Sequence, residues 1–125
     1  MSGRGSRAAS AGRDDRGAGT VVALGLGLGI LAATMLAVPL FSALAARHAV
    51  TGAADAAALA GADAAGGLVP GFPCEVAARV ALANGAIVES CRVDGLVVTV
   101  SVGRTVLGLA LSERASAGPA GSAPD

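Results

Sequence analysis

Residues 18–46, AGTVVALGLGLGILAATMLAVPLFSALAA, form an apolar run without a charged side chain. As an α-helix with a rise of 1.5 Å per residue, this run is roughly 43 Å long, whereas the hydrocarbon core of a bilayer is ~30 Å thick. A chain of 125 residues is too short to surround so long an apolar helix on every side within a soluble protein. The run therefore predicts a membrane-spanning helix.

The rest of the chain lies on either side of this run. Residues 1–17 are polar, rich in Gly, Ser and Ala and without hydrophobic periodicity, so we expect a basic cytoplasmic leader with no fold of its own. Residues 47–111 are expected to form a small domain outside the membrane, and residues 112–125 a disordered tail. The predicted fold class is an α+β membrane protein, in which the long helix extends beyond the membrane and is followed by a short helix and a β-hairpin.

Charge is distributed unevenly about the apolar run, although the net charge is zero. Four Arg and two Asp precede the run, and five Arg and seven acidic residues follow it. Because Arg near a span favours the cytoplasmic side, we expect a single-pass protein of the cell membrane with its N-terminus in the cytoplasm and its C-terminus outside. The chain has no basic patch, and its only aromatic residues are Phe41 and Phe72, so we expect no nucleic-acid partner.

Small residues recur every four positions along the apolar run, at Gly25, Gly29, Ala33 and Ala37. On a helix, this spacing places them on one face. Since helices pack closely in lipid where their side chains are small, these four residues predict a helix-packing face within the membrane.

The Ala-rich segment that follows, residues 47–65, favours helix. We expect the spanning helix to continue through it and to end at Gly66-Gly67. Small residues again form a stripe, made of Ala54, Ala57, Ala58, Gly61, Ala62 and Ala65. The sequence leaves open whether this stripe packs against its own domain or against another subunit.

A second, shorter helix is predicted from Cys74 to Asn84, with Gly85 as its left-handed terminator. Its inner side is expected to carry Val76, Val80 and Ala83.

Two β-branched runs, residues 86–93 and 96–102, then flank Asp94-Gly95, a pair that favours a type I′ turn. Such a turn predicts four facing pairs, which are Val93 with Leu96, Cys91 with Val98, Glu89 with Val100, and Ile87 with Val102. One face of the hairpin would then be apolar apart from Glu89. For residues 104–111, the sequence leaves two alternatives, a short strand and a helical turn.

The only two cysteines, Cys74 and Cys91, are expected to form a disulfide. Cys91 lies on the hairpin face that the second helix must cover, and Cys74 begins that helix. On the chain-entropy model, closing a loop of this size stabilises a domain by about 3 kcal/mol. A metal site would require more ligands than these two thiols and the distant His48.

No catalytic site is expected. His48 is the only histidine, and its nearest candidate partners for a hydrolytic triad, Ser42 and Asp55, are too widely spread along a continuous helix. Since no phosphate loop, carboxylate pair or metal-ligand cluster stands out, we expect neither an enzyme nor a cofactor, and no small-molecule substrate.

The order of these features resembles the TadE/TadG-like pilin-related proteins. The matching features are a leader ending in Arg16-Gly17, a small residue at Ala18, an uninterrupted apolar helix, then Arg47-His48 and the Ala-rich run 53–62. The likeness is greatest to the short actinobacterial branch of that group, encoded beside Tad/Flp secretion genes. The resemblance implies a pilin-like fold, cleavage by a prepilin peptidase between Gly17 and Ala18, and packing with other pilin-like or Tad secretion proteins.

Such proteins usually carry Glu at the fifth position after the cut, where this chain has Val22. This difference argues against a major filament subunit. The expected function is therefore that of a minor structural or assembly component of a Tad/Flp-type pilus or secretion system, present in an extracellular filament after processing. Two alternatives are a permanently membrane-anchored extracytoplasmic binding protein and a secreted effector released by cleavage near Ala46.

Overall fold

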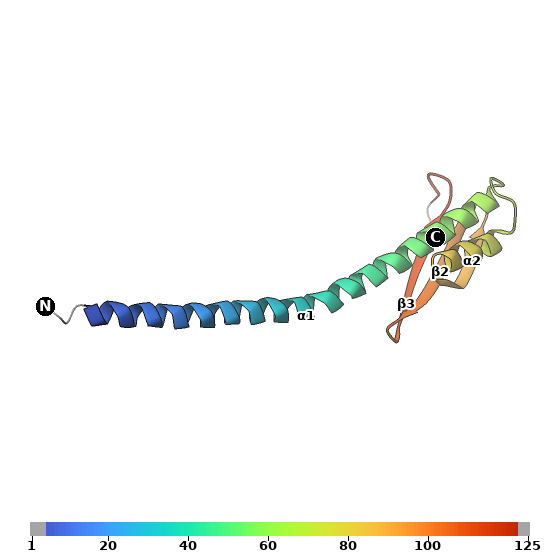
Figure 1. Ribbon diagram of the computed structural model, residues 1–125. Coiled ribbons are helices and arrows are strands. Elements are labelled where there is room, and N and C mark those ends of the chain that lie inside the picture. The colour runs from blue at the N-terminus through green and yellow to red at the C-terminus, as the bar shows by residue number, and fades with distance from the viewer. Residues whose placement is uncertain (1–4, 123–125) are drawn as a thin grey trace. The chain divides into compact units, whose positions relative to one another are not determined.

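The computed structural model describes the backbone of residues 5–122 and the side chains of residues 16–122. In chain order, the elements are α1 (Gly5–Ala65), α2 (Pro73–Ala83), β1 (Ile87–Asp94), β2 (Val97–Val106) and β3 (Leu109–Ala117), as Figure 1 shows. The α+β class is confirmed. The chain divides into two compact units, Met1–Ser42 and Ala43–Asp125, called unit 1 and unit 2 below.

Unit 1 is the N-terminal part of α1. Every side chain from Arg16 to Leu36 is exposed, and this part of the helix is long and apolar enough to cross a membrane. The helix continues through Pro39, and the hydroxyl of Ser42 donates a hydrogen bond of 2.8 Å to the Pro39 carbonyl oxygen.

The expectation for the leader needs correction, because α1 already begins at Gly5. Residues 5–17 are helical since they extend an existing helix, and extension avoids the costly nucleation step that a separate helix would require. Residues 1–4 of the predicted leader lie outside the described part of the chain.

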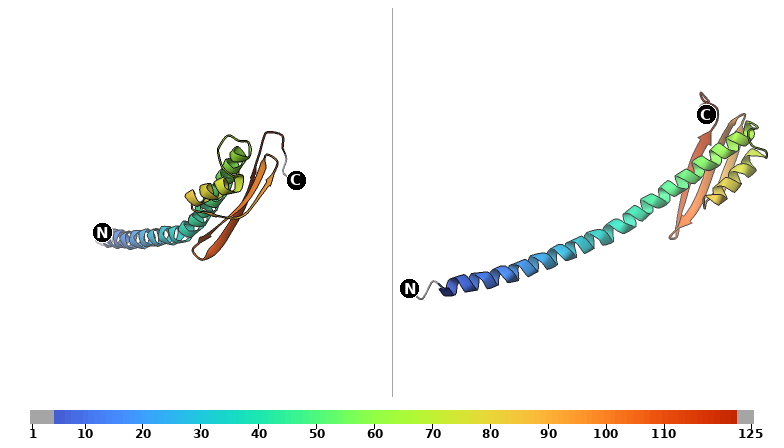
Figure 2. Two further views of the ribbon diagram at one scale, coloured as in Figure 1. Left: turned by 90° about the vertical axis from the view of Figure 1, so that its right-hand side faces the viewer. Right: turned by 45° about the horizontal axis from the view of Figure 1, so that its top comes forward.

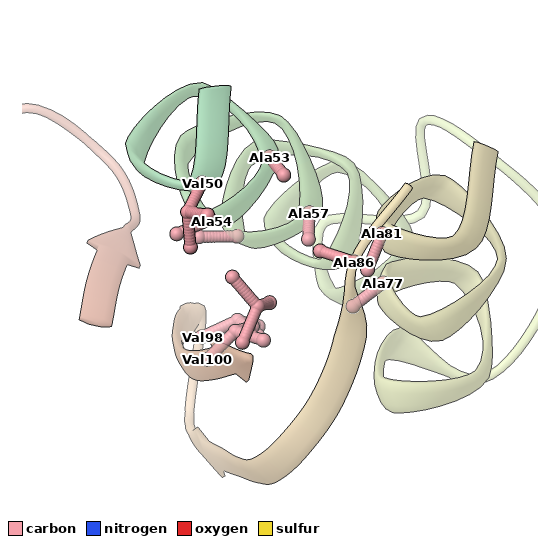
Figure 3. Close-up of a cluster of buried hydrophobic side chains, with 11 residues drawn as sticks. Val50, Ala53, Ala54, Ala57, Ala77, Ala81, Ala86, Val98 and Val100 are labelled. Atoms are coloured by element: carbon pink, nitrogen blue, oxygen red, sulfur yellow. The ribbon is translucent and has the colours of Figure 1, made fainter. Parts of the chain in front are cut away.

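In unit 2, the C-terminal part of α1 and helix α2 lie on one face of a three-stranded antiparallel sheet with the order β1-β2-β3 (Figures 1 and 2). Ala and Val side chains fill the space between helices and sheet (Figure 3). They are Val50, Ala53, Ala54, Ala57, Ala58, Ala77, Ala81, Ala86, Val98, Val100 and Val102. The small-residue stripe of residues 54–65 therefore packs against its own domain, which decides the alternative that the sequence left open.

Gly61 permits a close approach of three elements. A Cβ built at this position would lie 2.9 Å from Cγ1 of Val98 and 3.2 Å from the carbonyl oxygen of Pro73. It would also lie 3.4 Å from Cβ of Ala77. A side chain at position 61 would thus push α1 away from both α2 and β2.

This close packing also corrects the expected inner side of α2. The buried residues of α2 are Val76, Ala77 and Ala81, whereas Val80 is half-buried and Ala83 is exposed. The prediction is thus confirmed for Val76 and wrong for Val80 and Ala83. Ala77 is the side chain of α2 that meets Gly61, with its Cβ 3.4 Å from a Cβ built there, so a small side chain is needed at this point of contact.

Both helices of unit 2 end as predicted, at glycines in the left-handed conformation. At the end of α1, Gly67 has φ +76° and the Leu68 N–H donates to the Asp63 carbonyl at 2.9 Å. At the end of α2, Gly85 has φ +74° and the Ala86 N–H donates to the Ala81 carbonyl at 2.9 Å. Each is a Schellman motif, which satisfies carbonyl groups that the helix leaves free.

The β1–β2 hairpin forms, but the predicted register is wrong by two residues. The observed pairs include Asp94 with Val97, Val93 with Val98, and Cys91 with Val100. Gly95 has φ +61° and is the first central residue of the turn, as in type II′ geometry, whereas the predicted type I′ turn would have forced Asp94 to positive φ as well. Because side chains alternate with a period of two, this shift leaves Cys91 on the predicted face.

The predicted disordered tail is also wrong in part. Residues 109–117 form β3, which pairs with β2. The pairing runs from Val106 opposite Leu109, beside the turn, to Val98 opposite Ala117. The two strands are joined by Leu107 and Gly108, with φ +51° and +78°, the pattern of a type I′ turn. Residues 104–106 accordingly belong to β2, and the last three residues of the chain lie outside the described range.

Candidate functional site

The predicted disulfide is confirmed. The sulfur atoms of Cys74 and Cys91 are 2.06 Å apart, and their Cα atoms are 5.9 Å apart. Cys74 is the second residue of α2 and Cys91 lies in the middle of β1, so the bond ties this helix to an edge strand of the sheet. Both cysteines of the chain are used, which leaves no thiol for nucleophilic or metal chemistry.

A β-bulge re-orients Glu89, which was the one polar residue on the predicted apolar face of the hairpin. The register changes between Val88 and Ser90, so Val88 pairs with Val102. The Ser112 hydroxyl of β3 donates a hydrogen bond of 2.6 Å to Oε2 of Glu89. The Glu89 side chain thus reaches across β2 on the face of the sheet opposite the helices.

Gly103 makes this crossing possible. It lies on β2 between β1 and β3, where it pairs with Ile87 and Ser112, and a Cβ at position 103 would collide with the Glu89 carboxylate. Sequence reasoning missed this arrangement. The available signal was a glycine inside a β-branched strand, which often marks a bulge or a close approach.

Most of the rest of this outer sheet face is polar, with the exposed Ile87 as an exception. The hydroxyls of Thr99 and Ser116 are 2.8 Å apart across β2 and β3. A shallow depression beside them is lined in part by Arg92 and Arg114. Since these side chains are exposed hydroxyl and guanidinium groups, the face can make hydrogen bonds and ion pairs but offers no enclosed reaction chamber.

The predicted helix-packing residues lie on the exposed part of α1. Nothing is within 4 Å of a Cβ built at Gly25 or Gly29, Ala33 is exposed, and Ala37 is half-buried. This face is therefore open along unit 1. A shallow hollow surrounds Gly27 on the other side of the helix, because two residues advance a helix by about 200°.

The residues of the predicted leader cleavage site, Gly17 and Ala18, are both exposed within α1, and a Cβ at Gly17 would meet nothing within 4 Å. The sequence expectation of cleavage at this bond stays a prediction.

The three residues weighed as a hydrolytic triad are separated along α1. Ser42 is six residues before His48 and Asp55 is seven residues after it, or roughly 9 and 10 Å along the helix axis. The Ser42 hydroxyl instead donates to the Pro39 carbonyl, and His48 and Asp55 are exposed. Within residues 16–122, no three His, Cys, Asp or Glu side chains lie close enough to hold a metal ion.

An apolar groove of about 320 Å³ lies at the end of unit 2 where α1 terminates. It is lined by Leu59, Ala62, Asp63, Gly66, Leu68, Leu96, Gly118 and Pro119. Sequence reasoning did not anticipate it, because Gly118 and Pro119 were assigned to the disordered tail.

In unit 2, the Cys74–Cys91 disulfide and the Ser112–Glu89 hydrogen bond thus connect elements of the fold. No family model, curated protein or solved structure matches this chain.

Proposed function

We propose that this chain is a single-pass membrane protein that acts as a minor, pilin-like component of a Tad/Flp-type pilus or secretion system. The observation that supports the proposal most is the continuity of α1. One helix supplies both an exposed apolar segment able to cross a membrane and, from Val50 onward, the central helix of a small α+β domain. Subunits of this kind assemble by packing their apolar helices together, and the open Gly25–Gly29 face has the small side chains that such packing needs.

The domain is assigned to the outside of the cell. The Cys74–Cys91 bond supports this orientation, because disulfides persist in oxidising compartments and are rare in the cytoplasm. The charge distribution about residues 18–46 supports it independently.

The proposal is tested by identifying the N-terminal residue of the protein recovered from membranes, by mass spectrometry, in hosts with and without the prepilin peptidase. We expect a chain that begins at Ala18 only where the peptidase is present. An intact leader in both hosts would contradict pilin-like processing.

Two glycine variants sharpen this test. Gly17 and Gly19 are both exposed in α1 with open space around them, so Leu at either position leaves the fold unchanged. Gly17→Leu places a bulky side chain at the scissile bond and is expected to block cleavage, whereas Gly19→Leu is expected to be cut. Equal cleavage of both variants would show that the bond after Gly17 is not the site.

The second candidate function is a permanently anchored binding protein, and Val22 favours it. A filament subunit uses Glu at this position to pair with a neighbour's new amino terminus, and Val cannot. In that case the polar outer sheet face around Thr99 and Arg114 would meet the partner. Retention of the leader in the mature protein is the result that would favour this function.

Release of a soluble effector by cleavage near Ala46 is the third candidate. The first buried residue of the core is Val50, so such a cut would leave the domain's core intact. A mature form that begins near Arg47 and is recovered outside the cell would establish it.

A further inference from the structure

We propose that the tip of the β2–β3 hairpin is a membrane-docking surface, which inserts Leu107 and Leu109 into an anionic bilayer. This inference rests on the proposed membrane insertion of residues 18–46. It assigns a lipid contact to residues 107–109, which are far in sequence from that span.

The first observation is the composition and exposure of the tip. Residues 104–111, RTVLGLAL, contain four large apolar side chains and no acidic residue. Leu107 is 92% exposed and Leu109 is 69% exposed. Large exposed apolar side chains clustered at a turn are unfavourable in water unless a partner covers them.

The second observation is the backbone of Leu107, which has φ +51°. It is the only residue other than glycine with positive φ in the described chain. Turns of this type favour Asn, Asp or Gly at this position, because a Cβ is disfavoured there. Neither packing nor backbone conformation within the chain explains a leucine at this site, whereas contact with lipid does.

The two turns at opposite ends of β2 differ in composition. The β1–β2 turn is Asp94-Gly95-Leu96-Val97, in which Leu96 is 50% exposed and Val97 is half-buried. The β2–β3 turn is apolar throughout. The β2–β3 turn thus lacks the charged residue that the β1–β2 turn carries.

The apolar turn lies at the end of unit 2 where α1 enters it. Strand β2 and the α1 segment of this unit run in opposite directions, and the β2–β3 turn is at the entry end in all views (Figures 1 and 2). Val98 lies beside Gly61, and the eight residues of β2 that follow it carry the chain roughly 30 Å to Leu107 in the turn. Along α1, the 18 residues from Gly61 back to the start of unit 2 at Ala43 cover roughly 27 Å and include the end of the apolar run at Ala46.

The charges near this end fit an anionic membrane surface. Arg47 and His48 follow the apolar run on α1, and Arg104 precedes the tip on β2; all three are exposed. Arginine side chains at such a boundary bury their aliphatic stems and place the guanidinium among lipid phosphates. The combination of apolar tip and basic flank is typical of segments that rest in the interface of a bilayer.

A single tryptophan at the tip tests the proposal, because the chain contains neither Trp nor Tyr. The full-length Leu107→Trp protein is reconstituted into vesicles of phosphatidylcholine and phosphatidylglycerol, with and without brominated acyl chains that quench indole fluorescence on contact. We expect blue-shifted emission and strong quenching by the brominated lipid. Leu109→Trp, which does not occupy the strained position, is expected to behave in the same way.

The matched control is Leu96→Trp, the equivalent substitution in the turn at the other end of β2, and it should remain unquenched. Leu31→Trp, within the candidate span, reports on membrane insertion itself. Quenching of Leu31→Trp with no quenching at positions 107 and 109 would overturn the docking surface and leave the proposed anchor intact. No quenching at position 31 would overturn the anchor and the docking surface together.

The contribution of charge is measured separately, as the change in quenching when lipid or protein charge is removed. Replacing phosphatidylglycerol by phosphatidylcholine alone should reduce quenching at position 107, and Arg104→Gln in the Leu107→Trp background should produce the same reduction in the mixed vesicles. If quenching at the tip is insensitive to both changes, the preference for anionic lipid is wrong.

Discussion

Gly61 is the residue on which the packing of unit 2 depends most closely. Changing it to Ala adds one methyl group, 2.9 Å from Cγ1 of Val98 and 3.2 Å from the Pro73 carbonyl oxygen. Overpacking of this kind costs about 1–3 kcal/mol, which exceeds the gain of about 0.5–1 kcal/mol from replacing a helical glycine. We expect Gly61→Ala to lower the free energy of unfolding of unit 2 by about 1 kcal/mol, measured as faster amide hydrogen exchange in β2 of the full chain in detergent.

Gly52 provides the matched control, because it lies on the same helix and nothing is within 4 Å of a Cβ built there. Gly52→Ala should stabilise α1 by about 0.5–1 kcal/mol. If the two alanine variants are equally stabilising, the close approach of α1 to β2 is incorrect.

At the residue scale, some features could be predicted from the sequence and others could not. The glycine terminators at Gly67 and Gly85 were predictable because their role depends only on the local backbone. The reach of Glu89 to Ser112 was not, since it depends on a bulge and on the gap at Gly103, and both depend on three strands being in place.

At the scale of elements, the disulfide is the main constraint on α2. Cys74 and Cys91 are 17 residues apart, and closing a loop of that length stabilises a domain by roughly 3 kcal/mol on the chain-entropy model. We expect the Cys74→Ser/Cys91→Ser protein to lose about that much stability, measured by urea unfolding in detergent with and without a reductant.

The reductant serves as the internal control in that experiment. It should lower the stability of the unaltered protein to that of the double variant and leave the double variant unchanged. Retention of full stability after complete reduction would mean that the packing of Ala77 and Ala81 alone holds α2 in place.

The sequence predicted helices more successfully than strands, for a physical reason. Helix α1 and helix α2 are defined by local propensity and by their ends, and both were anticipated to within a few residues in unit 2. Strand β3 was missed because its residues, LALSERASA, are mostly small or polar and have weak strand propensity. Its formation depends on pairing with β2 and on a turn at Leu107 that no turn preference would suggest.

At the scale of the whole molecule, a matched pair of leucines tests whether residues 18–46 span a membrane. Leu28 and Leu59 lie on the same helix and are 60% and 59% exposed. In water, Arg at either position would be tolerated equally. In a bilayer, Arg near the centre of the span costs roughly 2.5–3.5 kcal/mol on insertion scales.

We therefore expect Leu28→Arg to reduce the fraction of protein that resists alkaline extraction from membranes, and Leu59→Arg to leave it unchanged. Equal extraction of both variants would argue against a span centred near Leu28.

The Ala and Val core of unit 2 also has a thermal consequence. Among residues 16–122, the largest fully buried side chains are Val50, Val98, Val100 and Val102, and both phenylalanines are exposed. The heat-capacity change of unfolding arises chiefly from the hydration of apolar surface, and it averages about 12–15 cal/mol/K per residue. A core of such small side chains exposes less apolar surface than average, so we expect unit 2 to fall below this range in calorimetry. Its stability curve should then be flat, so that the domain loses little stability on cooling or moderate warming.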